Sequence, residues 1–269
     1  MRSIRKVRNI GPSFIYIIRC DIINAMKDMT ISGLTVTLID MGAGHAPPDT
    51  VVYTHLDGDG AREAAALVPP CRAVLAAVDG VDWDDALSPW KAPRAFRGGQ
   101  DFSGGADAHI ALMTGGVMPA VENALGFVPV RRMIAGYSLA GLFAVYALYK
   151  TGAFTGVASV SGSLWYDGFV EYMGNAPLAL PARDIIAYFS LGDRESAARN
   201  PRLAAVGRCT QEAERLLKQK GASTLFELNP GGHFDDSAQR LARGVAFLTN
   251  SMSNGSPAGA LPEAGPQLP

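Results

Sequence analysis

Short apolar runs alternate with helical patterns through the middle of this chain, and the alternation restricts the folds that it can adopt. The runs are rich in apolar or β-branched residues and are bounded by Gly, Pro or Asp, as strands are. They cover 34–40, 51–56, 72–78, 131–137, 156–162, 184–192 and 223–229. One intervening helical pattern starts with Asn200 and Pro201 and ends at Gly221. Such alternation predicts an α/β fold with a mostly parallel central sheet and helices on both faces.

Two connections refine this prediction. The first two runs are joined by the short segment 41–50, which predicts an antiparallel start to the sheet. Segment 106–125 has the apolar spacing of a helix, and Pro119 within it predicts a kink.

Composition excludes several classes of protein. Of the 269 residues, 48% are hydrophobic and 18% are charged, so one α/β domain with a sizeable core is expected. The net charge is -1, which attracts neither nucleic acid nor a membrane surface. The three cysteines have no CxxC spacing, so we expect no zinc site or disulfide framework, and a reducing, cytoplasmic location.

The two ends fall outside the alternating pattern. We divide the chain into an N-terminal extension (1–30), one folded α/β domain (31–250) and a disordered tail (251–269) that is rich in Pro, Gly and Ala. The extension has a basic start, and its apolar patch "FIYII" is too short for a membrane span. Three interpretations remain open for it: a mobile segment, an extra helix or a degraded signal.

Ser138 stands where a predicted strand, "RRMIAGY", meets an apolar helix, "LAGLFAVYALYK". The pentapeptide "GYSLA" has the pattern G-x-S-x-small, which fits a nucleophile elbow. In that turn the backbone is crowded two residues before and after the serine, and the serine is held strained with its oxygen exposed. The pattern predicts Ser138 as a nucleophile, although an ordinary Gly-Ser turn has the same sequence.

A serine nucleophile needs an acid and a histidine base, and in α/β-hydrolases the acid follows the serine and the histidine comes last. His233, in "NPGGHF", lies after the last predicted strand and is the expected base. The loop after 184–192 supplies two acids, and its spacing from Gly192 favours Glu195 over the alternative Asp193. We expect His45 and His109 to have surface or packing roles, and His55 precedes the serine in the sequence.

Other site residues are predicted more loosely. The oxyanion hole is expected to use backbone N–H groups of Leu139, directly after the nucleophile, and of Gly58 and Asp59, in a Gly-rich loop. Aromatic side chains near the predicted active-site edge could form walls of a substrate pocket. They are Trp83, Trp90, Trp165 and Tyr137.

Taken together, these motifs resemble the esterase family of α/β-hydrolases that includes esterase D and the enterochelin (siderophore) esterases. The resemblance runs through "VVYTHLDGDG", "AGYSLAGLFAVYALYK", "YFSLGDRESAARNP" and "NPGGHF", and covers about residues 33 to 250. It implies the α/β-hydrolase fold, a triad of Ser138, Glu195 and His233, no metal and no organic cofactor. The chain departs from the common pentapeptide at Ala140, which replaces the second glycine.

The predicted function is therefore a serine esterase that forms an acyl-enzyme with a small-molecule ester, either siderophore-like or an aryl or short-chain ester. A thioesterase or acyltransferase on the same triad is the main alternative, and a non-catalytic binding protein is a weaker one. The sequence leaves a homodimer open.

Overall fold

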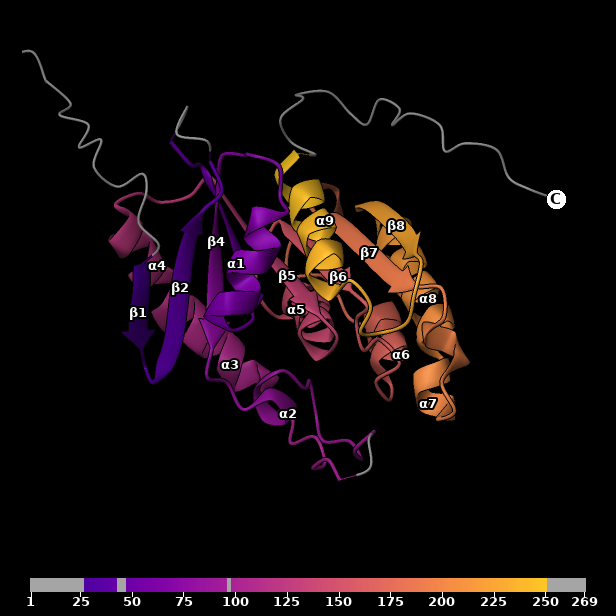
Figure 1. Ribbon diagram of the computed structural model, residues 1–269. Coiled ribbons are helices and arrows are strands. Elements are labelled where there is room, and N and C mark those ends of the chain that lie inside the picture. Colours follow the sequence, from indigo (N-terminus) through magenta and orange to yellow (C-terminus); the bar gives the residue numbers. More distant parts are fainter. Residues whose placement is uncertain (1–26, 43–46, 96–97, 251–269) are drawn as a thin grey trace, which may run out of the picture.

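A computed structural model of the protein describes residues 27–42, 47–95 and 98–250 (Figure 1). All but four residues of the predicted extension, and the whole predicted tail, lie outside the described residues.

The described residues form one eight-stranded sheet in the order β1-β2-β4-β3-β5-β6-β7-β8. The strands are β1 (Lys27–Ile31), β2 (Leu34–Asp40), β3 (Thr50–His55), β4 (Ala73–Asp79), β5 (Arg131–Tyr137), β6 (Gly156–Val160), β7 (Ile186–Gly192) and β8 (Ser223–Asn229). From β4 to β8 all neighbouring strands are parallel, and β2 is antiparallel to both β1 and β4. This is the mostly parallel sheet that the alternating pattern predicts.

The start of the sheet differs from the prediction in two ways. β1 lies inside the predicted extension and pairs with β2 through the tight turn at Ser32 and Gly33, both with positive φ. β2 does run against the parallel strands, but β4 lies between it and β3. β2 and β3 are therefore not paired with each other, and they do not form a hairpin.

Helices cover both faces of the sheet (Figure 1). Those described are α1 (Gly58–Ala66), α2 (Trp83–Ala86), α3 (Ala106–Leu112), α4 (Met118–Leu125), α5 (Leu139–Lys150), α6 (Phe169–Asn175), α7 (Pro201–Ala204), α8 (Val206–Lys220) and α9 (Ser237–Asn250). One buried hydrophobic cluster packs α1 and α9 against one face of the sheet. A larger hydrophobic cluster packs α3, α4, α5, α6 and α8 against the other face. Because α5 lies in the larger layer and is buried from Leu139 to Tyr149, it can be apolar all round.

The predicted helix over 106–125 consists of α3, a π-helical turn (Met113–Val117) and α4 in direct succession. Pro119 has no N–H to donate, and its ring would clash with the carbonyl four residues earlier in a regular helix. A wider turn directly before the proline relieves both problems. The proline therefore changes the helix type locally.

Candidate active site

Ser138 occupies the turn between β5 and α5, at the carboxyl end of the central strands. Its backbone has φ 57° and ψ −121°, an unusual conformation for a residue with a side chain. The turn is held by Ser138 N–H, which donates to the Val160 carbonyl at 3.0 Å, and by Ser163 N–H, which donates to the Ser138 carbonyl at 2.9 Å. The structure thus gives Ser138 the strained strand-to-helix geometry that the pentapeptide predicts.

The small residues around Ser138 have a steric reason. A Cβ atom at Gly136 would lie 2.2 Å from the Ala140 carbonyl carbon, closer than any real contact. Gly136 and Ala140 are therefore packed backbone to backbone across the turn. Alanine at position 140 is accommodated, so the departure from the common pentapeptide leaves the turn intact.

Three side chains from distant parts of the sequence form one hydrogen-bonded row. His233 Nε2 lies 3.1 Å from Ser138 Oγ, and His233 Nδ1 lies 2.7 Å from Glu195 Oε2. Ser138 follows β5, Glu195 follows β7, and His233 follows β8, so all three lie beyond the carboxyl ends of parallel strands. Ser138 and His233 are half-buried, whereas Glu195 is buried.

Glu195 is a buried carboxylate with several donors. Burial acts to raise its pKa, but hydrogen bonds from His233, Ser161 and the Gly192 N–H outweigh this effect and hold the pKa below its usual value. Ser161 Oγ and Gly192 N each lie 2.7 Å from Glu195 Oε1. Oε2 is left to face the imidazole, so the residue is an anion that orients His233.

Asp193, the alternative acid, has a different position. Its Oδ1 accepts a hydrogen bond from the Gly231 N–H at 2.8 Å, and its own N–H donates to the Asn229 carbonyl at the same distance. Asp193 thus fastens the start of the loop 230–236 that carries His233. It supports the histidine through the backbone and not through the imidazole ring.

The predicted oxyanion donors lie at the same edge of the sheet. Leu139 begins α5, so its N–H is among those that a helix leaves without an internal partner. Gly58 and Asp59 begin α1, and Asp57 caps that helix by accepting from the Gly60 N–H at 2.7 Å. A Cβ at Gly58 would lie 3.1 Å from Thr37 Oγ1 of β2, so Gly58 is on the side of β3 away from β5.

Asp57 directly precedes Gly58 in the loop after β3 and offers one more backbone N–H there. In the parallel pair of β3 and β5, Thr54 lies opposite Ala135, and Asp57 and Ser138 each follow three residues later. The Asp57 N–H is therefore a further candidate donor of this loop, beside those of Gly58 and Asp59.

The predicted aromatic residues have separate positions. Trp83 begins α2 and is 40% exposed. Trp90 packs among aromatic rings of α5 and α6, and its indole N–H donates to the Asp167 carbonyl at 3.0 Å. Trp165 is buried beneath the Arg202 guanidinium, whose central carbon lies 5.4 Å from the ring centroid. The Tyr137 hydroxyl donates to the His233 carbonyl at 2.5 Å, so Tyr137 supports the histidine loop.

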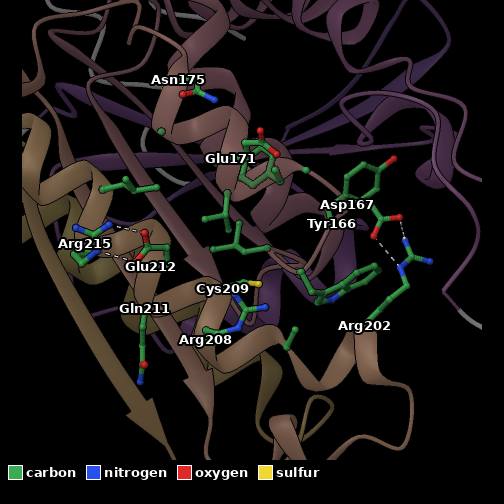
Figure 2. Close-up of a pocket in the computed structure, with 18 residues that line it drawn as sticks. Tyr166, Asp167, Glu171, Asn175, Arg202, Arg208, Cys209, Gln211, Glu212 and Arg215 are labelled. Atoms are coloured by element: carbon green, nitrogen blue, oxygen red, sulfur yellow. Dashed lines mark hydrogen bonds and ion pairs between the residues drawn. The ribbon is translucent and has the colours of Figure 1, made fainter.

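A pocket of about 1010 Å³ opens between α6 and α8 (Figure 2). None of Ser138, Glu195 and His233 lines it, but Trp165 does. Trp165 follows by two residues Ser163, whose hydroxyl lies 3.5 Å from Ser138 Oγ. Ion pairs of Arg202 with Asp167 and of Arg215 with Glu212 flank the opening (Figure 2). The pocket is thus a neighbour of the hydrogen-bonded row and does not contain it.

His55 and His109 form a buried pair near this edge of the sheet. Their Nε2 atoms lie 2.8 Å apart, and both rings contact Phe143 of α5. Burial and the neighbouring His109 hold the pKa of His55 well below its usual value, and burial lowers the pKa of His109 to about 4. No group of three His, Cys, Asp or Glu residues suited to a metal occurs among the described residues.

Three further polar residues of the site were not predicted. Ser161 and Ser163 follow β6 and contact Glu195 and Ser138 respectively, and Arg240 of α9 contacts Glu195. "SVSGS" could have drawn attention to the two serines, because it follows a strand at the same edge. Arg240 carried no such signal, since an arginine in an amphipathic helix is ordinarily placed on its exposed face.

This architecture and the row at its edge define an α/β-hydrolase fold. No protein-family model matches the chain, and no curated protein sequence matches it significantly. Solved structures resemble it closely in fold. An IroE-like serine hydrolase from Shewanella oneidensis superimposes with a TM-score of 0.66 and 15% identity, over 80% of this chain and 75% of that one.

Two other similar structures are siderophore esterases. The siderophore hydrolase EstA from Aspergillus nidulans has a TM-score of 0.65 and 19% identity, over 91% of this chain and 99% of that one. The enterobactin esterase FES from Shigella flexneri has a TM-score of 0.59 and 21% identity, over 84% of this chain and 58% of that one. These proteins are of the kind that the sequence motifs resemble, and they confirm the predicted fold.

No helix of the described part of the chain combines the length and apolar character that crossing a membrane requires.

Proposed function

We propose that this protein is a serine esterase that hydrolyses a carboxylic ester through an acyl-enzyme. The observation that carries the proposal is the hydrogen-bonded row from Ser138 through His233 to Glu195, with Ser138 at a strained strand-to-helix turn. A serine hydroxyl is a weak nucleophile alone, and an imidazole within hydrogen-bonding distance can take its proton during attack.

The reaction follows from the roles that each group can fill. Ser138 Oγ attacks the ester carbonyl carbon while His233 Nε2 accepts the hydroxyl proton, and Glu195 stabilises the resulting imidazolium. His233 returns the proton to the departing alcohol, which leaves Ser138 acylated. Water, activated by His233, then attacks the acyl carbon; the carboxylic acid leaves and Ser138 recovers its proton.

The developing oxyanion needs donors that are already oriented. We assign the Leu139 N–H as the first donor, because it is the first N–H of α5 and the positive end of that helix's dipole lies there. The second donor comes from the loop after β3, where the backbone N–H groups of Asp57, Gly58 and Asp59 are the candidates.

The substrate is proposed as an ester with an aromatic or otherwise bulky acyl group, with siderophore esters as the first class to test. Two observations support this class. Similar folds belong to siderophore hydrolases, and Trp165 lies close in sequence to Ser163, which contacts the nucleophile.

The decisive experiment is covalent labelling with a fluorophosphonate, followed by hydrolysis of p-nitrophenyl esters and catecholate trilactones. We expect one label, at Ser138, and Ser138→Ala should lower kcat by on the order of 10⁴ or more. Ser163→Ala is the matched control, because it removes a hydroxyl 3.5 Å from Ser138 Oγ and leaves the proposed nucleophile in place. Hydrolysis by Ser138→Ala at the wild-type rate would disprove the assignment.

A further inference from the structure

Arg240 is a buried cation that contacts Glu195 of the candidate active site. It lies in the first turn of α9, only 2% of the residue is exposed, and it is the largest fully buried side chain of the described residues. Burying an unpaired guanidinium would cost several kcal/mol, so its acceptors must be provided by the fold. One of them is the carboxylate of Glu195: Arg240 Nη1 lies 3.0 Å from Oε1 and also donates to Ser161 Oγ at 2.9 Å.

The other nitrogens of the same guanidinium hold the histidine loop. Nε donates to the Asp235 carbonyl at 2.8 Å, and Nη2 donates to the carbonyls of Asp235 and Gly232. Gly232 precedes His233 in the chain, and Asp235 follows it by two residues. The rigid, planar guanidinium of Arg240 therefore forms hydrogen bonds to the loop on both sides of His233 and to the Glu195 carboxylate at the same time.

The other hydrogen bonds and ion pairs that hold the loop involve its backbone or its exposed side. The Tyr137 hydroxyl holds the His233 carbonyl, Asp193 holds the Gly231 N–H, and the Arg194 side chain pairs with the Asp235 carboxylate at 2.9 Å. Among the residues that the structure describes, His233 and Arg240 are the basic side chains that contact the Glu195 carboxylate. Arg240 thus links the acid to the position of the base.

We propose that Arg240 is a positioning residue of the esterase, which fixes His233 relative to Glu195 and sets the pH range in which the pair is active. This inference rests on the proposed function, because it assigns Arg240 a role through Glu195 and His233. A lysine could supply the charge, but its single ammonium group cannot reach Glu195 and both loop carbonyls together.

The positive charge of Arg240 determines the direction in which its removal shifts the pH dependence of activity. The cation beside Glu195 opposes the addition of a proton to the Glu195–His233 pair. Removing it makes the pair bind a proton more tightly, so the protonated, inactive form persists to higher pH. A unit charge a few ångströms away is worth about one pH unit or more in a partly buried site. If Arg240 had a purely structural role, its removal would change the amount of folded protein but not the pH at which activity is lost on the acidic side.

The experiment measures the rate of fluorophosphonate labelling of Ser138 against pH, which needs no knowledge of the natural substrate. Arg240→Gln removes the charge and Arg240→Lys keeps it. Arg243→Gln is the matched control, because Arg243 lies on the same helix and pairs with Glu227 and Asn229 at 2.7 Å, away from Glu195. Circular dichroism and the melting temperature report the folding of each variant.

We expect Arg240→Gln to move the acidic limb of the labelling rate upward by about one pH unit. Arg240→Lys should keep the limb and lower the maximal rate at least about tenfold, since the loop is no longer gripped on both sides. Arg243→Gln should match the wild type in both respects. A folded Arg240→Gln with the wild-type limb and rate overturns the proposal.

If Arg240→Gln does not fold, the lysine variant decides alone, and a wild-type maximal rate for it also overturns the proposal. Failure of the proposed function gives a different result, because wild-type protein would then show no label at Ser138 at any pH.

Discussion

Glu195 uses its two carboxylate oxygens for different purposes. Oε2 faces the imidazole of His233, while Oε1 accepts from Ser161, the Gly192 N–H and Arg240. Asp193, two residues earlier, is occupied by the backbone of Gly231. The two acids that the sequence offered are thus distinguished by what they touch, since one orients the base and the other orients the loop.

Glu195→Gln should lower kcat/KM by roughly 10²–10⁴. Glutamine can keep the contacts of Oε1, but it then places an amide NH₂ where Oε2 meets His233 Nδ1, so two donors face each other and the imidazole takes the wrong tautomer. Steady-state hydrolysis of a p-nitrophenyl ester measures the effect.

Asp193→Asn is the matched comparison and should cost far less, because the amide oxygen can still accept from the Gly231 N–H. The reverse ranking would move the role of the acid to Asp193. A loss below tenfold for both would mean that Ser138 and His233 act as a dyad.

The junction of β5 and α5 depends on close backbone contact at Gly136. We expect Gly136→Ala to lower the melting temperature and to reduce fluorophosphonate labelling of Ser138 by at least about a hundredfold. Its Cβ cannot fit 2.2 Å from the Ala140 carbonyl carbon, so the turn must open and displace the serine.

Gly174→Ala is the control for this prediction, because a Cβ at Gly174 of α6 meets no atom within 4 Å. It should label at the wild-type rate. Wild-type labelling by Gly136→Ala would show that the turn tolerates a side chain there, contrary to the packing argument.

Local patterns gave the order and type of most elements but not their neighbours. The cap at Asn200 and the left-handed Gly221 delimit the region of α7 and α8 as predicted, because capping depends on residues that are adjacent in the chain. β1 was missed because "KDMTI" is mostly exposed at the sheet edge and has no apolar run. The place of β4 between β2 and β3 is a property of the assembled sheet.

The same difference between local sequence pattern and assembled structure applies to the site. Ser138, Glu195 and His233 could be proposed because each follows a predicted strand, and the carboxyl ends of parallel strands meet at one edge. The Arg240 contacts depend on where α9 packs relative to that edge of the sheet, which local sequence patterns do not determine. The aromatic residues Trp90 and Trp165 were placed correctly after strands, but which of them packs inward depends on α5, α6 and Arg202.

At the scale of the whole molecule, the described residues include another buried pair of ionisable side chains besides Glu195 and Arg240. His55 at the end of β3 and His109 of α3 share one hydrogen bond beside α5, which joins three elements of the larger buried cluster. The core stays intact only while both rings are neutral, because a charged imidazole there would have lost its hydration without gaining an anionic partner. The stability of the fold is therefore coupled to pH through this pair.

We expect the free energy of unfolding to fall as the pH drops from about 6.5 toward 4. Both histidines have lowered pKa values in the folded protein, that of His109 being about 4, so only the unfolded chain gains protons at these positions over most of this range. Stability follows the difference in bound protons, and His109 alone removes about 2 kcal/mol between pH 7 and pH 5, with a further loss from His55. Urea unfolding at the two pH values measures the loss. His109→Gln, whose amide can still donate to His55 Nε2, should lose less than the wild type. Equal urea midpoints at pH 7 and pH 5 in the wild type would show that the pair takes up protons without disturbing the core.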